Sequence, residues 1–182
     1  SHPVLAPDGS RVAMAKFDGG NIDVWVYDLV RNVNQRLTSD PALDDSPVWS
    51  YDGERIAFAS SRAGHHDLYQ IAASGAGREE LLYASGENKF PTSWSPDGRY
   101  LLYGAQARET AGDIWVLPLD GTSKRAPVPL MHTRANEVGG TFSPDARWIA
   151  YVSDDSGIAE VYVQPFILPS ASVDSPAGPK VL

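Results

Sequence analysis

A five-residue turn sequence occurs four times in this chain at nearly equal intervals, and this repetition restricts the fold more than any other feature. The copies read APDGS, SYDGE, SPDGR and SPDAR, and their turn aspartates are Asp8, Asp52, Asp97 and Asp145. The steps between these aspartates are 44, 45 and 48 residues, a period typical of propeller blades or of helical arrays. A second motif, an acidic residue followed two positions later by Trp or Tyr, stands 15 or 16 residues after each turn Asp, at Asp23, Asp67, Asp113 and Glu160.

Each repeat contains four strand-like segments. A short inner strand is predicted before the turn, at Pro47–Ser50, Pro91–Ser95 and Gly139–Ser143, and a strongly apolar strand follows the turn. Pro presets φ and Gly accepts a positive φ, so Pro-Asp-Gly predicts a tight hairpin closed by a bulge. The second and third strands are apolar at nearly every position, which predicts sheets that are covered on both faces. The 16 Gly and 14 Pro residues, with no helical periodicity, exclude helical arrays.

The fold class predicted from this pattern is all-β: a β-propeller, or a segment of one, built of four antiparallel blades with four strands each. The blades are expected at about 1–40, 41–85, 86–132 and 133–182, within a single propeller domain or segment. In the last blade a long loop at Leu168–Gly178 precedes the expected outer strand at Pro179–Leu182.

At these residues the chain resembles the TolB-like β-propeller family, whose repeats read W-S-P-D-G, an apolar strand, then D-[IL]-[WY]. Stretches such as SPVWSYDGERIAFASSR and NKFPTSWSPDGRYLLY are most similar to propellers fused to bacterial receptor serine/threonine kinases. Two positions depart from the motif: Tyr51 replaces the turn Pro, and Ala146 replaces the turn Gly, where a positive φ costs about 1 kcal/mol.

The resemblance implies a location and a blade count. It implies the periplasmic or extracellular side of a bacterial membrane. It also implies closure with six or more blades, so a chain with four is expected to be an open segment of a larger propeller or half of an oligomeric ring. A closed four-bladed ring is the third possibility.

Composition argues against several classes of partner. The net charge is −8 and Lys and Arg form no cluster, so a nucleic-acid or anionic-membrane partner is not expected. No apolar run reaches about 18 residues, so direct membrane insertion is not expected, and the N-terminus lacks the pattern of a signal peptide. The absence of Cys excludes disulfides and thiolate chemistry.

The sequence shows no catalytic constellation, and no catalytic residue, metal site or cofactor is predicted. His65-His66-Asp67 resembles a metal motif, but adjacent residues of a strand point to opposite faces. There is no G-x-S-x-G sequence, and the acidic pairs Asp44-Asp45 and Asp154-Asp155 lack the spacing of a calcium loop. The four repeat acids are expected to accept hydrogen bonds from nearby backbone N–H groups, and the aromatic residues that follow them are expected to pack between blades.

Function is therefore expected on loops, at one end of the blades. The loops between second and third strands share this end, here called the loop face, with the connections between blades; the Pro-Asp-Gly turns lie at the other end, the turn face. The predicted binding residues on the loop face are Asp44, Asp45, Arg62, His65, His66, Lys89, Phe90, Arg108, Arg134, Asn136 and Glu137. Their mixed charge and one aromatic ring suit a protein or peptide partner.

Two functions fit this pattern. The first is a non-catalytic binding and scaffold module that engages a protein, peptide or small ligand with its loop face. The alternative, implied by the resemblance, is a propeller segment that gates a separate catalytic domain of the prolyl-oligopeptidase type. Replacing Arg62, Lys89 and Arg134 by Ala is predicted to weaken partner binding with little change in stability, since exposed charges contribute little to folding.

The end blades of an open arc would each have one uncovered apolar face. Residues expected there are Val12 and Met14 in the first blade, and Ile149, Tyr151 and Val161 in the last. Soluble proteins rarely expose large apolar patches, so homo-oligomers formed through the terminal blades are predicted.

Overall fold

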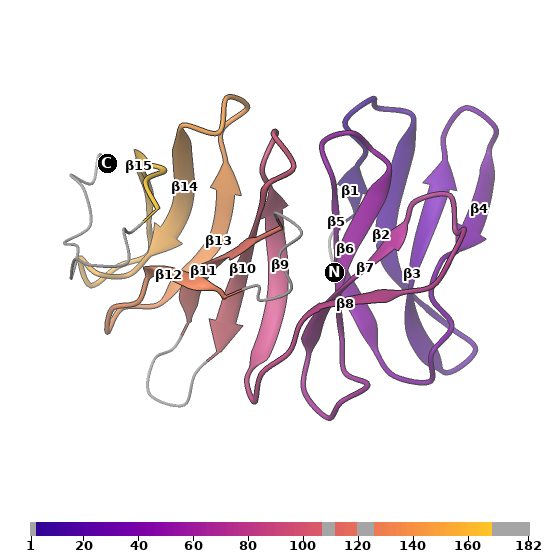
Figure 1. The fold of residues 1–182 in the computed structure, drawn as a ribbon, viewed down its shortest axis with the longest axis horizontal. Helices are drawn as coiled ribbons and strands as arrows, with labels where there is room; N and C mark the ends of the chain where they lie inside the picture. The colour runs from indigo at the N-terminus through magenta and orange to yellow at the C-terminus, as the bar shows by residue number, and fades with distance from the viewer. Residues whose placement is uncertain (1–2, 107–111, 120–125, 169–182) are drawn as a thin grey trace. The chain divides into compact units, whose positions relative to one another are not determined.

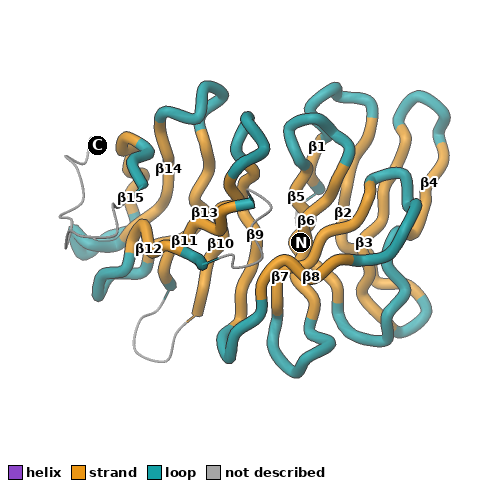
Figure 2. Tube along the Cα trace, in the orientation of Figure 1, coloured by secondary structure: helices purple, strands orange, loops and turns teal. Residues whose placement is uncertain are grey.

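The computed structural model describes residues 3–106, 112–119 and 126–168, and in these residues the chain is all-β (Figures 1 and 2). The strands form four separate antiparallel sheets, each following the chain in simple up-and-down order. The described residues contain no helix that could cross a membrane. The predicted fold class is thus confirmed, and the strands divide between two compact units, Ser1–Pro91 and Thr92–Leu182.

The first unit holds two complete four-stranded sheets, each a meander in which neighbouring strands pair in sequence order. The first sheet consists of β1 (Val4–Leu5), β2 (Arg11–Asp18), β3 (Asn21–Asp28) and β4 (Val33–Arg36). The second sheet consists of β5 (Asp44–Trp49), β6 (Arg55–Ser60), β7 (Asp67–Ala72) and β8 (Glu80–Tyr83).

The other two sheets follow the same plan. The third consists of β9 (Asn88–Trp94), which begins before the unit boundary, β10 (Tyr100–Gln106), β11 (Asp113–Pro118) and β12 (Val128–Met131). The fourth consists of β13 (Glu137–Phe142), β14 (Trp148–Ser153) and β15 (Glu160–Pro165). The outer strand expected at Pro179–Leu182 and most of the loop before it lie outside the described residues.

The repeated turns owe their structure to hydrogen bonds among their own residues. In the third repeat the Ser95 hydroxyl donates to the Asp97 carboxylate at 2.6 Å, and the N–H groups of Arg99 and Tyr100 donate to Asp97 (3.1 Å) and to the Ser95 oxygen (2.9 Å). The second and fourth repeats contain the same three bonds. The turn glycines have positive φ, and Ala146 has φ 56°, which confirms the conformation predicted for it. The motif therefore encodes the turns.

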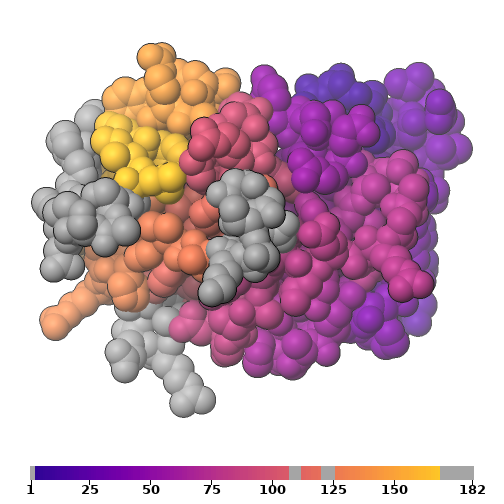
Figure 3. Space-filling view, in the orientation of Figure 1, coloured from indigo at the N-terminus to yellow at the C-terminus, as the bar shows by residue number. Residues whose placement is uncertain are grey.

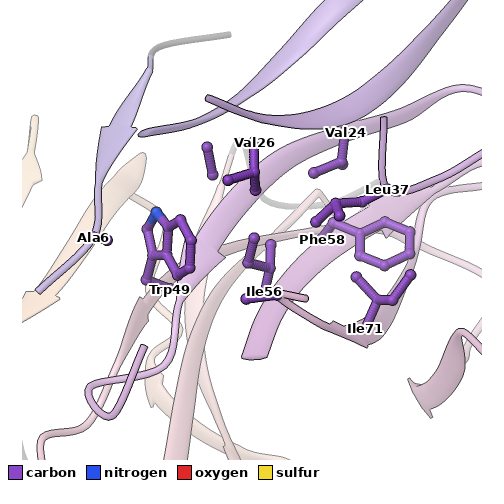
Figure 4. Packing of buried hydrophobic residues seen from close by; sticks show 10 residues of the cluster. Ala6, Val24, Val26, Leu37, Trp49, Ile56, Phe58 and Ile71 are labelled. Carbon is purple, nitrogen blue, oxygen red and sulfur yellow. The ribbon is translucent and has the colours of Figure 1, made fainter. Parts of the chain in front are cut away.

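Side chains from neighbouring sheets form one apolar core in each unit. In the first unit, residues of the first sheet pack onto those of the second around Trp49, Ile56, Phe58 and Ile71 (Figure 4). In the second unit, the third sheet packs onto the fourth around Leu102, Ile114, Val116, Ile149, Tyr151 and Tyr162. Phe58 stacks on Tyr69 and Tyr151 on Tyr162 at equivalent positions, with ring centroids 5.9 and 5.7 Å apart. The predicted packing of repeat aromatics between blades is confirmed for Tyr69 and Tyr162.

The uncovered face predicted for the last blade needs a correction. Ile149 and Tyr151 are buried, because they face the third sheet within the second unit. Val161 is 62% exposed, since its side chain points to the opposite face of the fourth sheet from Tyr162. The prediction combined residues from two faces of one sheet.

Candidate binding face

The loops assigned to the loop face meet within each unit. In the first unit, Asn21 at the β2–β3 hairpin donates to the Asp40 and Ala42 carbonyls at 2.8 and 3.0 Å, and the Ser61 N–H donates to the Leu43 carbonyl at 2.9 Å. In the second unit, the Asn136 N–H donates to Asp154 at 2.8 Å. Hairpin tips and the connections between sheets therefore share one end of the strands, as their connectivity requires.

Three predicted binding residues lie in the core instead of on loops. Asp44, Lys89 and Glu137 are at most 1% exposed. The inner strands β5, β9 and β13 begin earlier than predicted and include them, so their expected place on exposed loops is wrong. Each stands five residues before the last core aromatic of its strand, Trp49, Trp94 or Phe142, and this spacing in the sequence could have identified them as one repeated position.

Lys89 forms an ion pair inside the first unit. Its Nζ lies 2.9 Å from Asp67 Oδ1 and donates to the Ser85 hydroxyl at 2.9 Å and to the Glu87 carbonyl. The Lys89 N–H donates to the His66 carbonyl at 2.9 Å, which aligns the start of β9 with the start of β7. Buried charges are retained only when paired and hydrogen-bonded, and both members of this pair meet that condition. Lys89 is therefore a structural residue.

Arg62, on the loop face of the first unit, links two acidic side chains. Its guanidinium lies 3.3 Å from Asp44 and 2.5 Å from Glu79, and it covers the Tyr69 ring at 4.2 Å. Burial raises the pKa of the Asp44 carboxyl, although hydrogen bonds from Ser60 and Thr38 and the charge of Arg62 act in the opposite direction. Burial alone would lower the pKa of Arg62, but Glu79 and Asp44 raise it overall. Most of the hydrogen-bonding capacity of this guanidinium is thus already used within the chain.

The repeat acids were predicted to accept backbone N–H groups, and this explanation is incomplete. Asp67 does accept the Ser85 N–H at 3.2 Å, but its main partner is Lys89. Asp23 contacts Arg36 at 2.7 Å, and Asp113 contacts His132 Nδ1 at 3.1 Å. The fourth acid, Glu160, accepts the Ser156 hydroxyl at 2.6 Å. The three aspartates thus share a position in the repeat but pair with different side chains.

A partly exposed aromatic cluster adjoins the buried pair. The His66 and Phe90 rings lie 4.9 Å apart, and His66 Nε2 lies 3.9 Å from Asp45 Oδ2. The His66 N–H donates to the Asn88 side chain at 3.0 Å, so hydrogen bonding fixes the backbone of this residue. His65 is half-buried beside it. The structure therefore brings together three of the predicted binding residues, Asp45, His66 and Phe90.

In the second unit, Arg134 is exposed and Asn136 is half-buried, and both lie between β12 and β13. Arg108 lies outside the described residues. Three apolar residues on the loop face were missed by the sequence analysis, namely Phe17 (71% exposed), Leu43 and Ile158. Nothing in the repeat marks them, because hairpin tips vary from one blade to the next. Only Ile158 had a local signal, since it directly follows Gly157 of a hairpin tip.

The described residues contain no group of three or more His, Asp or Glu side chains that could hold a metal ion. The buried acids instead face Arg, Lys or His side chains or hydroxyl groups. A hydroxyl precedes each inner-strand charge at the sheet junction: Thr38 for Asp44, Ser85 for Lys89 and Thr133 for Glu137. This arrangement stabilises the junctions between sheets, and the three inner-strand charges are not exposed on the loop face.

Repeated four-stranded meanders with a shared turn and apolar packing from sheet to sheet define the class of β-propeller repeat proteins. The family model of the TolB beta propeller domain (PD40) matches residues 1–125, and the chain belongs to this family. It is similar to the Tol-Pal system protein TolB of Helicobacter pylori strain J99, with 26% identity over 176 residues that cover 93% of this chain and 42% of that protein.

Solved structures of similar fold agree with this assignment. TolB from Acinetobacter baumannii has a TM-score of 0.78 and 23% identity, over 91% of this chain and 40% of that one. A prolyl endopeptidase has a TM-score of 0.66 and 13% identity, over 94% of this chain and 27% of that one. These two likenesses show the fold alone. The chain spans less than half the length of these three proteins.

Proposed function

We propose that this chain is a non-catalytic binding and scaffold module that engages a protein or peptide partner through its loop face, on the periplasmic or extracellular side of a bacterial membrane. The observation that carries the proposal is which side chains of the loop face are buried and which are exposed. Its buried acids, such as Asp44 and Asp67, are paired inside the fold. Each unit also exposes apolar side chains at this end: Phe17 and Leu43 in the first unit, and Ile158, together with the exposed Arg134, in the second. Exposed aromatic residues and Arg are enriched where proteins bind one another.

Family membership supports the class of partner. The relative from Helicobacter pylori is named as a component of the Tol-Pal system, and the other proteins of such a system are the first partners to test. A small anionic ligand is less well supported, because Lys89 is buried in an ion pair and Arg62 already binds two carboxylates.

The test measures binding to purified Tol-Pal proteins by biolayer interferometry. Phe17→Asp and Arg134→Glu are each expected to raise the dissociation constant by roughly tenfold, the scale of one interface hot spot. Tyr51→Asp is the matched control, since Tyr51 is 57% exposed but lies in a turn on the opposite face. Binding that responds to Tyr51→Asp and not to the loop-face variants would overturn the proposed face.

A second candidate is a segment that gates a separate serine peptidase domain, as the likeness to the prolyl endopeptidase suggests. It predicts that a catalytic domain is encoded in the same gene. The gene sequence on either side of this chain distinguishes the two functions, and a kinase domain with a membrane helix there would instead support a receptor kinase.

A further inference from the structure

The chain contains five Asp-Gly pairs, and four of them lie in the described residues. Asp-Gly is the dipeptide at which a protein backbone rearranges most readily, because Gly has no side chain to shield its nitrogen from the carboxyl group of the preceding Asp. The pairs at 8–9, 52–53 and 97–98 belong to the repeated turns, and the pair at 18–19 forms part of the β2–β3 hairpin tip. The pair at 120–121 lies outside the described residues.

The carboxylates of the three turn pairs are held by hydrogen bonds. Asp8 accepts the Ser10 N–H at 2.9 Å and the Ser10 hydroxyl at 2.7 Å. Asp52 and Asp97 each accept a Ser hydroxyl and a backbone N–H. The hydrogen bonds from Ser10 lower the pKa of Asp8, and the Ser50 hydroxyl lowers that of Asp52. These carboxyl groups are therefore held in place, and in the ionised form, which is the less reactive toward a nucleophile.

The Gly nitrogens of the same three pairs are held as well. The N–H groups of Gly9, Gly53 and Gly98 each donate to the carbonyl of the residue three positions earlier, at 2.9 Å. For the Gly nitrogen of a turn to attack the side chain of its Asp, the hydrogen bonds of both groups must first break. The turn structure thus protects its own Asp-Gly pair.

The pair at 18–19 has none of this protection. Asp18 is exposed and pairs with Asn21 across the two-residue loop Gly19-Gly20, at the tip of the hairpin that joins β2 and β3 (Figure 1). In the described part of the chain, no hydrogen bond or ion pair engages the Asp18 carboxylate or the Gly19 N–H.

The surroundings of this hairpin tip are open. A Cβ built on Gly19 or Gly20 would meet no atom within 4 Å, and the two residues have φ 61° and 98°. Two successive glycines also give the backbone more freedom than any other dipeptide. The hairpin belongs to the first unit, whose surface is indigo to magenta in Figure 3.

We propose that the Asp18-Gly19 bond is a site of spontaneous covalent modification, at which Asp18 converts to isoaspartate. The Gly19 nitrogen attacks Cγ of the protonated Asp18 carboxyl group. The amide proton and the side-chain hydroxyl leave together as water, and a cyclic succinimide forms. Water then opens the ring at one of its two carbonyl carbons. Opening at the backbone carbonyl leaves the chain running through Cγ, which is isoaspartate, and opening at Cγ restores aspartate. Nothing is oxidised or reduced, and the mass of the chain is unchanged.

The modification would change the hairpin. Isoaspartate adds one carbon to the backbone, whereas a two-residue hairpin loop fixes the register of its strands. The extra carbon is expected to break the pairing of Asp18 with Asn21 and to displace the next pair, Phe17 with Ile22. Phe17 is 71% exposed on the loop face, so partner binding is expected to fall as isoaspartate accumulates, a consequence that rests on the proposed function.

Peptide mapping of the folded chain, incubated for several weeks in warm and mildly acidic buffer, tests the proposal. Trypsin places the four pairs in separate peptides: 1–11, 17–31, 37–55 and 90–99. Isoaspartyl peptides separate from aspartyl peptides by chromatography at equal mass, and protein L-isoaspartate methyltransferase methylates them. Conversion in peptide 17–31 is expected to be at least about tenfold faster than in the other three, because reaction in a turn must first break hydrogen bonds of both groups.

Two controls assign the reaction to this residue and to the fold. Peptide 17–31 also contains Asp23 and Asp28, and Asp18→Glu should abolish its conversion, since the longer side chain closes a succinimide-type ring far more slowly. In a chain unfolded by urea the four pairs should react at similar rates, because the turns no longer protect theirs. Equal conversion of the four pairs in the folded chain, conversion only in urea, or conversion that persists in Asp18→Glu would each overturn the proposal.

Binding of the aged protein to purified Tol-Pal proteins separates the modification from its consequence. The wild type should lose binding in proportion to its isoaspartate content, and Asp18→Glu, aged in the same way, should not. If peptide 17–31 is converted and binding is unchanged, the modification site stands and the binding role proposed for Phe17 is wrong.

Discussion

Substitution of the buried pair between Lys89 and Asp67 tests the structural role assigned to Lys89. Lys89→Met keeps the length and apolar stem of the side chain but removes its charge. It leaves the Asp67 carboxylate, 1% exposed, with the Ser85 N–H and without its cation. Removing one partner of a buried ion pair costs about 3–5 kcal/mol, because the other charge stays desolvated. A protein of this length shifts its melting temperature by about 2–4 °C per kcal/mol, so a decrease of roughly 6–20 °C is expected.

The assay is thermal and urea unfolding followed by circular dichroism and tryptophan fluorescence. Asp67→Asn is also expected to destabilise the folded chain. The double variant Lys89→Met with Asp67→Asn should lose less free energy of unfolding than the sum of the two single losses, by at least about 1 kcal/mol, because residues in contact are energetically coupled. Lys16→Met is the matched control within the same unit: Lys16 is exposed and covers the Trp25 ring at 4.2 Å, so its loss should cost no more than about 1 kcal/mol. The reasoning fails if the free energy of unfolding of Lys89→Met lies within about 0.5 kcal/mol of the wild-type value, the usual range of surface substitutions.

Two further predictions concern the turns. Ala146→Gly should stabilise the folded chain by up to about 1 kcal/mol, because Ala146 has φ 56°. The reverse change, Gly98→Ala, should destabilise it by about 1–2 kcal/mol through backbone strain alone, since Gly98 has φ 73° and no neighbouring atom lies within 4 Å of the new Cβ. Urea unfolding measures both changes. The Ser143 hydroxyl and the Arg147 N–H lower the pKa of Asp145, and Ser50 lowers that of Asp52 in the same way. Below the ordinary pKa of 3.8 the unfolded chain therefore binds more protons than the folded chain, so the stability should fall as the pH drops below about 4. The double variant Asp52→Asn with Asp145→Asn should show a smaller fall, which unfolding measured from about pH 2 to about pH 6 tests.

The turns and the blade plan were predictable because their causes are local. The hydrogen bonds of the turn join residues close in the sequence, such as Ser95 with Asp97 and Tyr100, so reading the local sequence is enough to place it. The positive φ of Ala146 followed from its place in the repeat. Apolar runs such as Ile56–Ala59 predicted sheets covered on both faces, and this segment of β6 is fully buried.

The inner-strand charges were misplaced because their partners are distant in the sequence. Lys89 is stable in a core only because Asp67, 22 residues earlier, faces it, and nothing near Lys89 in the sequence shows that pairing. A single charged residue before a strand is more often solvent-exposed, so the loop interpretation was the natural one. Alignment of the repeats by Trp49, Trp94 and Phe142 would have shown that this position is always charged, and a charge that recurs at one core position of a repeat indicates a structural role.

The burial of these charges also changes which chemistry the loop face can offer. Arg62 and Lys89 would have made it a cationic surface, but one is buried and the other is held by two carboxylates. Withdrawing either to bind a ligand would leave Asp44 or Asp67 buried without its cation, at a cost of several kcal/mol that a small anion could not offset. Phe17, Leu43, Ile158 and Arg134 carry no such penalty, because the side chains of all four are already exposed. Recognition through these residues depends on the apolar area that the loops of each unit expose, and a protein surface can cover such area where a small anion cannot.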